Sequence, residues 1–243
     1  MLTGDPVADI WSGGARAFQL ARDPSCASQA RALLAGTMRE LRFAGETIQD
    51  AKLAVSELAT NAHTHAPSAN QAPPELWIWA RTRPTSELVV CVFDTCRERG
   101  PVLRNKNPLD EHGKGLSIVA ALCRSTGTHI TRSRLTSKTG KCVWFALAVP
   151  PSRPTTNRVI APAFAANRLT EALSARGIPA TRRSDDSGIS VINVAALNIW
   201  VEPKVFAWRT PSGYTRQPLV DLQETAERIV SHYETSRSSP SPT

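Results

Sequence analysis

Glu57 and Asn61 combine residue types and a spacing that suit work on a bound ligand. They lie four positions apart in the stretch LAVSELATNAHTHA, residues 53–66. With 3.6 residues per helical turn, their side chains would point within about 40° of each other and could face one pocket. The carbonyl oxygen of Asn61 can bind Mg²⁺, and the carboxylate of Glu57 can orient or deprotonate an attacking hydroxyl or water. The alternative is an exposed glutamate and a tolerated asparagine on an ordinary packing helix.

Two further stretches place polar or flexible residues where a strand ends and a helix begins. Asp94 follows the apolar run ELVVCVF, where its carboxylate could accept a hydrogen bond from the exocyclic amine of adenine. Many strands also end in aspartate because turns favour it. In HGKG, residues 112–115, Gly113 and Gly115 let backbone N–H groups approach phosphates at a helix start, and Lys114 adds positive charge. Such a helix start is common and gains meaning only beside the other two features.

An antiparallel sheet with helices on one face is expected to position these residues. Apolar periodicity and breakers predict a strand at residues 16–22 and two helices at 23–41 and 47–66. They then predict a hairpin at 75–82 with 87–94, a third helix at 113–125 and two last strands at 128–135 and 141–149. The charged stretch 95–113 contains two prolines and has no clear period. It is therefore predicted to be a long loop that closes over a phosphate chain as a lid.

Taken in this order, the stretches resemble the ATP-binding domains of the Bergerat-fold superfamily of gyrase-type, heat-shock chaperone, histidine kinase and mismatch-repair proteins. Within it, the likeness is strongest to the small anti-sigma-factor serine kinases. LAVSELATNAHTHA is similar to their N box, VVCVFD to the strand before the G1 aspartate, HGKGLSIVAAL to the G2 box and GKCVWFAL to the last strand. The resemblance covers residues 15–149.

The resemblance implies an α+β fold, a two-layer α/β sandwich whose mixed, mainly antiparallel sheet carries helices on one face. It implies ATP and Mg²⁺ as cofactors, Glu57 as the catalytic residue and Asn61 as the metal ligand. The nucleotide would also contact Asp94, Gly113, Lys114, Gly115 and Leu116. The implied partners are a sequestered sigma factor and an anti-anti-sigma protein that is phosphorylated on serine, and a homodimer is one assembly to consider.

Two positions depart from the superfamily pattern. A glycine usually stands two residues after the aspartate, where this chain has Cys96, and glycine is delayed to Gly100. Many relatives carry a threonine in the last strand that helps bind the adenine edge, and Cys142 is expected in that place. Both departures favour weaker nucleotide binding. They keep open a second hypothesis, a non-catalytic ATP-binding module that acts through its C-terminal domain.

Composition excludes some classes of protein. Hydrophobic residues make up 41% and charged residues 21%, and no stretch approaches the ~18 apolar residues of a membrane span. Together with a start unlike a secretory signal, this predicts a cytoplasmic protein that does not insert into membranes. Five scattered cysteines without a C-x-x-C motif predict a reduced compartment and no structural zinc. The formal charge of +8 is spread along the chain, so a nucleic-acid partner is not expected.

The C-terminal part is predicted to be separate from the ATP-binding domain of residues 1–149. Residues 150–158, PPSRPTTNR, indicate a linker. Residues 159–235 are predicted to form a small α+β domain of unknown role, with the helix FAANRLTEALSARG, the strand-like GISVINVAALNIWV and KVFAWRT, and the closing helix LVDLQETAERIVSHYE. The tail, 236–243, is expected to be disordered.

Overall fold

The computed structural model describes residues 10–64, 72–97, 114–151, 160–184, 188–211 and 213–238. Its strands form two five-stranded sheets, with the orders β1-β2-β3-β5-β4 and β10-β9-β8-β7-β6. The first sheet contains β1 (Ala15–Gln19), β2 (Glu75–Arg81), β3 (Glu87–Asp94), β4 (Ser125–Arg132) and β5 (Thr139–Ala148). The helices that accompany it are α2 (Cys26–Glu40), α3 (Gly45–Thr64) and α4 (Lys114–Leu122).

Strands β2 and β3 of the first sheet are buried on both faces. Every residue of β2 and β3 is buried, although alternate side chains of a strand point to opposite faces. Leu76, Ile78 and Val90 share one core with α2, α3 and α4. The opposite face gathers a second cluster that includes Trp77 and Phe93, whose rings stack with centroids 5.1 Å apart. A second layer must therefore cover this rear face of the sheet.

The second sheet follows in the chain and has its own core. It contains β6 (Thr181–Ser184), β7 (Ser190–Val194), β8 (Leu197–Val201), β9 (Val205–Thr210) and β10 (Gly213–Pro218). Helix α5 (Pro162–Ser174) precedes it, and the short η1 (Leu219–Asp221) and α6 (Leu222–Ser238) follow it. Both α5 and α6 pack on the same face of this sheet, over a core that includes Ile199 and Phe206.

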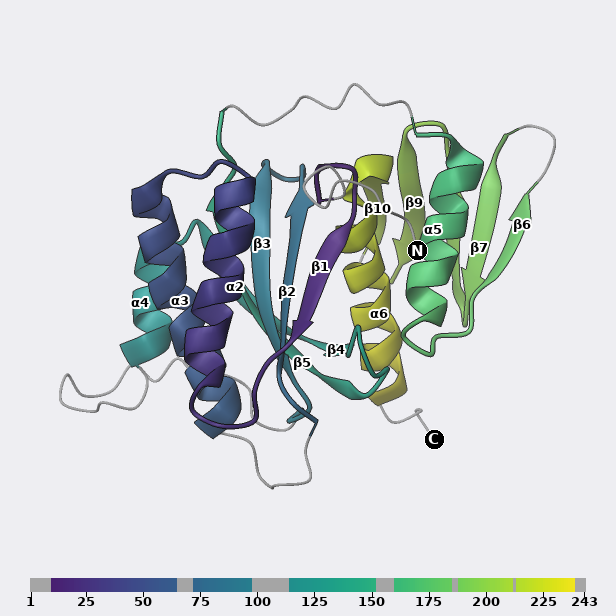
Figure 1. The fold of residues 1–243 in the computed structure, drawn as a ribbon. Coiled ribbons are helices and arrows are strands. Elements are labelled where there is room, and N and C mark those ends of the chain that lie inside the picture. The colour runs from purple at the N-terminus through teal and green to yellow at the C-terminus, as the bar shows by residue number, and fades with distance from the viewer. Residues whose placement is uncertain are drawn as a thin grey trace.

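Helix α6 is the layer that covers the rear face of the first sheet. Figure 1 shows it between the two sheets, with α2, α3 and α4 on the far side of the first one. It turns Ala226, Ile229 and Val230 toward the second core. It turns Glu224 and Glu227 toward the first sheet, where both are buried. The molecule therefore has more layers than the two-layer sandwich expected for residues 1–149 alone.

Glu227 is the centre of the contact between α6 and the first sheet. Its Oε1 accepts hydrogen bonds from Arg134, at 2.9 Å, and from Arg176 at the end of α5. Its Oε2 accepts a bond of 3.0 Å from Thr131 and lies 3.2 Å from Nε2 of His129. Burial by itself raises the pKa of Glu227, but the guanidiniums of Arg176 and Arg134 outweigh burial and hold that pKa well below its usual range.

Two more carboxylates of α6 form ion pairs with arginines of the first sheet or of the residues that follow its strand β3. A carboxylate oxygen of Glu224 lies 3.5 Å from a guanidinium nitrogen of Arg81. The carboxylate of Glu234 pairs with Arg132 at 2.6 Å and with Arg97 at 3.0 Å. Because Arg97 follows β3 by only three residues, α6 is tied directly to the end of that strand.

Asp221 fixes the start of α6 to the β2–β3 hairpin. Its carboxylate accepts hydrogen bonds from the N–H and hydroxyl of Thr82, at 2.8 and 3.0 Å, and from the N–H of Arg83 at 3.2 Å. Burial raises the pKa of Asp221 to about 6, against the opposing effect of the Thr82 hydrogen bonds. The β2–β3 hairpin therefore supplies two strands of the first sheet and also binds the start of the helix that covers the rear face of that sheet.

Several predicted details differ from the structure. All strand pairs among the described residues are antiparallel, so the expected mixed character is absent from this part of the sheet. The stretch GISVINVAALNIWV is a hairpin of two strands, and Ala195 in its turn adopts a φ of 49°. The turn was missed because neither of its two residues is a glycine or an asparagine, the usual signals of a tight turn. Strands β6 and β10 were not predicted. Helix α6 continues to Ser238, so residues 236–238 are helical. The rest of the predicted tail, residues 152–158 of the predicted linker and most of the 95–113 loop lie outside the described residues.

Cys91 and Cys142 form a disulfide between β3 and β5, with Cα atoms 6.0 Å apart. The sequence did not predict this pairing, because 51 residues of sequence separate two positions that strand pairing brings together. Cys26, Cys96 and Cys123 are free. None of the helices in the described part of the chain has the length and apolar character that a bilayer span requires.

Candidate functional site

Glu57 and Asn61 lie on α3 beside its buried stripe, as the sequence predicts. The stripe includes Ala51, Val55 and Leu58, which pack toward the sheet, while Glu57 and Asn61 are half-buried. Neither side chain forms a hydrogen bond or ion pair within the part of the chain that the structure describes. Two polar groups held at the edge of a core, without internal partners, are available to a ligand.

Gly115 brings α4 directly against Glu57. A Cβ atom added to Gly115 would overlap Oε2 of Glu57 and stand 3.2 Å from its Cδ. The absence of a side chain at residue 115 is therefore what lets the first turn of α4 lie on the carboxylate. This contact joins two of the sequence motifs, which are more than 50 residues apart in the chain.

Gly115→Ala is expected to be less favourable when Glu57 is present, because the carboxylate at the end of that flexible side chain must move aside, and to be neutral or stabilising in a Glu57→Ala background. Alanine favours a helix over glycine, so only the collision with Glu57 opposes the substitution. A double-mutant cycle by urea unfolding should give a coupling of about 1 kcal/mol. Gly36→Ala is the control: Gly36 lies inside α2 with nothing within 4 Å of its Cβ direction. That variant should gain about 0.5–1 kcal/mol in both backgrounds, and equal behaviour of the two glycines would contradict the contact.

Asp94 ends β3 on the face of the sheet that α3 covers, because the alternate residues Val90 and Val92 belong to the helix-side core. Its Oδ1 accepts hydrogen bonds from Nζ of Lys141, at 2.7 Å, and from the N–H of Cys96, at 2.8 Å. Lys141 also donates to the carbonyl of Cys96 at 2.6 Å. Although Cys96 replaces the usual glycine, the turn after the strand is thus fixed by three hydrogen bonds.

Lys141, and not Cys142, stands beside Asp94, so Cys142, expected in the place of the relatives' threonine, does not face the candidate site. A shift of one position along a strand moves a side chain to the other face. Cys142 lies in the rear-face cluster and is bonded to Cys91. The preceding Gly140 is needed for the close pairing, since a Cβ there would overlap the carbonyl oxygen of Asp94 and approach the Phe93 ring to 2.6 Å.

The remaining predicted contacts are only partly described. Lys114 is the first residue of α4, and Leu116 packs against the helix-side core. Gly113 and Gly100 lie outside the described residues, as does the body of the predicted lid. The structure therefore brings Glu57 and Gly115 together and places Asp94 on the same face of the sheet.

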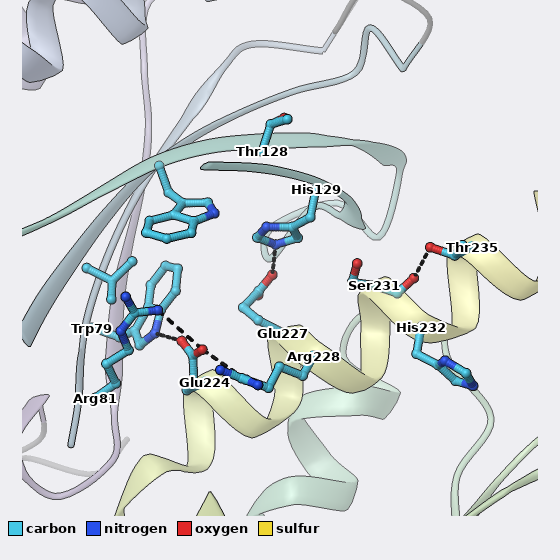
Figure 2. A pocket seen from close by; sticks show the side chains of 12 residues that line it. Trp79, Arg81, Thr128, His129, Glu224, Glu227, Arg228, Ser231, His232 and Thr235 are labelled. Atoms are coloured by element: carbon cyan, nitrogen blue, oxygen red, sulfur yellow. Dashed lines mark hydrogen bonds and ion pairs between the residues drawn. The ribbon is translucent and has the colours of Figure 1, made fainter. Parts of the chain in front are cut away.

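A cavity of about 470 Å³ lies elsewhere, between the rear face of the first sheet and α6 (Figure 2). Trp79 lies at one end of the residues that line it, and Ser231 and His232 of α6 lie at the other. Glu224 and Glu227 also line it, but both are already engaged by neighbouring residues. Because Glu57 and Asp94 belong to the opposite face, this cavity is separate from the candidate site.

Comparison with known families agrees with the geometry. Residues 20–147, more than half of the 243-residue chain, match the model of the histidine kinase-like ATPase domain. The chain therefore belongs to this family of ATP-binding domains. No curated protein matches the chain.

The described residues fit a nucleotide with a divalent cation. The start of α4 presents backbone N–H groups, and the missing side chain of Gly115 leaves its backbone open to close approach. Mg²⁺ keeps several waters and binds phosphate oxygens, so a single carbonyl such as that of Asn61 is a sufficient protein ligand. In the described part of the chain, no group of three His, Cys, Asp or Glu side chains forms a preassembled metal cage.

Proposed function

We propose that the protein is an ATP-binding regulator that resembles an anti-sigma-factor serine kinase. It transfers phosphate from Mg-ATP to a serine of a partner protein and controls a transcription factor by binding it. The contact between Gly115 and Glu57 supports this best, because it joins a helix start suited to phosphates with a carboxylate suited to a hydroxyl. The proposed substrate is an anti-anti-sigma protein, the proposed client is a sigma factor, and the proposed compartment is the cytoplasm.

Each residue of the site has a distinct proposed role. Mg-ATP supplies the phosphoryl group. Asn61 holds the metal, and the backbone at Gly113, Lys114 and Gly115 holds the phosphates. Glu57 orients the serine hydroxyl or accepts its proton, since phosphoryl transfer depends mainly on positioning and charge neutralisation. A homodimer would need a surface other than the rear face of the first sheet, because α6 covers that face.

A non-catalytic ATP-binding module is the second candidate. One observation favours it: Arg97, three residues after Asp94, pairs with Glu234 of α6 at 3.0 Å. Nucleotide bound at Asp94 could therefore change how the C-terminal unit is held, with no need for turnover. Both candidates share the nucleotide site and differ only in the chemistry at Glu57.

Asp94→Asn is expected to weaken ATP binding about tenfold or more, because the carboxylate accepts a charged hydrogen bond from the adenine amine. Titration calorimetry with ATP and ITP tests the contact directly, since the base of ITP lacks that amine. The parent should prefer ATP about tenfold, and Asp94→Asn should lose the preference.

Lys141→Gln separates recognition of the base from positioning of the carboxylate. It removes the ion pair to Asp94 but leaves the Asp94 carboxylate in place as a hydrogen-bond acceptor. It should therefore weaken the binding of ATP and of ITP by the same factor and keep the preference for ATP. An Asp94→Asn variant that still prefers ATP to the same degree as the parent would show that the adenine pocket is assigned to the wrong residue.

A further inference from the structure

The second sheet carries helices on one face only. Ile192, Ile199 and Phe206 point into the core under α5 and α6. The alternate residues of the same strands point the other way, and none of the helices in the described part of the chain packs over them. In Figure 1, α5 lies in front of these strands and the other face is turned away from the viewer.

Strand register places a row of side chains across this face on all five strands. The pairs Arg183↔Val191, Val191↔Trp200, Trp200↔Ala207 and Ala207↔Arg216 join end to end. A second pair, Arg209↔Tyr214, lies on the same face of β9 and β10. The open face is defined here by Arg183, Trp200, Arg209, Tyr214 and Arg216.

The open face is aromatic and basic. Trp200 is 49% exposed and Tyr214 is 58% exposed. Arg183 and Arg209 are exposed and have no hydrogen-bond or ion-pair partner within the described ranges. Among the residues that the structure describes, the one carboxylate on this face, Glu202, is paired with Arg216 at 2.7 Å. The described charged groups of the face therefore sum to an excess of positive charge around two exposed rings.

We propose that the open face binds single-stranded nucleic acid. Trp200 lies between the short residues Val191 and Ala207 and keeps 49% of its surface exposed, so part of its indole is open to stack on an unpaired base. With strands about 4.8 Å apart, Arg183 and Arg216 each lie about 10 Å from Trp200, on opposite sides, where they can meet the flanking phosphates. A duplex hides the faces of its bases and cannot use the rings in this way.

The sequence gives no sign of this arrangement. Its basic residues look evenly spread, and a nucleic-acid partner was not expected from them. The five residues of the open face come from four strands, and only the register of the sheet gathers them. The inference does not depend on the proposed kinase activity, because the open face belongs to a different sheet from Glu57 and Asp94.

Fluorescence anisotropy of the full chain with labelled single-stranded dT12 tests the proposal. The parent should bind dT12 more tightly than a duplex of the same length. Trp200→Ala should weaken dT12 binding about tenfold with an unchanged salt dependence, because stacking carries no charge. Arg183→Gln should lower the slope of log affinity against log salt by about 0.7, the value for one phosphate contact on a single strand.

Matched controls lie on the opposite face of the same domain. Arg182 is the neighbour of Arg183 on β6, but it pairs with Ile192 in the helix-side row. Phe164 on α5 is an exposed ring beside Arg168, with the guanidinium 5.9 Å from its centroid. Arg182→Gln and Phe164→Ala should leave dT12 binding and its salt slope as in the parent.

Three results would overturn the proposal. One is no binding of dT12 at 50 mM salt. Another is that the parent binds dT12 and the duplex with equal affinity and that Trp200→Ala changes neither affinity. Such binding would reflect only the net charge of +8. The third is retention of a protein by the immobilised parent chain from nuclease-treated extract, lost in Trp200→Ala, with dT12 failing to compete; it would assign the face to a protein partner.

Discussion

Glu227→Ala is expected to destabilise the folded chain by about 3–5 kcal/mol. The carboxylate is 3% exposed and is the shared acceptor of Arg176, which is also buried, and of Arg134, whose side chain is 10% exposed. Removing it leaves two guanidiniums without their counter-charge, and an uncompensated buried charge is far more costly than a lost surface pair. Guanidinium-chloride unfolding followed by circular dichroism measures the change.

Glu202→Ala is the matched control for this prediction, because Glu202 pairs with Arg216 at 2.7 Å on the surface. It should cost less than about 1 kcal/mol. The pH dependence gives a second check: the pKa of Glu227 is depressed in the folded state, so its contribution is complete above the unfolded value of about 4.3 and is lost as pH falls through the folded pKa. The difference between the parent and Glu227→Gln should therefore shrink below about pH 4. A Glu227→Ala cost as small as that of Glu202→Ala would show that α6 is not held by this carboxylate.

The elements around Glu57 could be predicted because their signals are local. A 20-residue helix with an apolar stripe and a hairpin of two apolar strands each show their own period. The resemblance then supplied the order of the motifs, from which closeness of Glu57 and Gly115 could be expected. Lys141 was missed because its importance depends on which face of β5 it occupies. The alternation of Val143 and Phe145 in the helix-side core was the signal that could have found it.

The position of α6 could not be predicted in the same way. Glu224, Glu227 and Glu234 look like the solvent face of an amphipathic helix. Glu224 does pair with Arg228 four residues on, but the partners that hold the helix in place lie between 51 and 145 residues away. One signal did exist. The continuous apolar run VVCVF indicates a strand buried on both faces, which a sheet covered by helices on one side cannot provide. It shows that the rear face is covered, without showing by what.

Glu57→Gln is expected to lower phosphate transfer by about 10²- to 10⁴-fold while ATP binding stays close to that of the parent. The carboxylate faces the attacking hydroxyl in the proposed site, so its loss removes the share of the rate that general acid–base catalysis usually supplies. Asn61→Ala should lose Mg²⁺-dependent ATP binding as well as turnover, because it removes the proposed metal ligand. The assay follows labelled phosphate from ATP to a co-purified partner, beside plain ATP hydrolysis.

Glu46→Gln supplies the control, since Glu46 lies exposed in the first turn of the same helix and should not change either rate. The pattern across the three variants separates the two candidate functions. If the protein is a kinase, Glu57→Gln must still bind ATP but must transfer much less phosphate than the parent. If the parent binds ATP with the Asp94-dependent preference for adenine, yet transfers and hydrolyses no more phosphate than Glu57→Gln, the kinase proposal fails. The nucleotide site then stands, and the tie between Arg97 and Glu234 becomes the route by which ATP acts on the C-terminal unit.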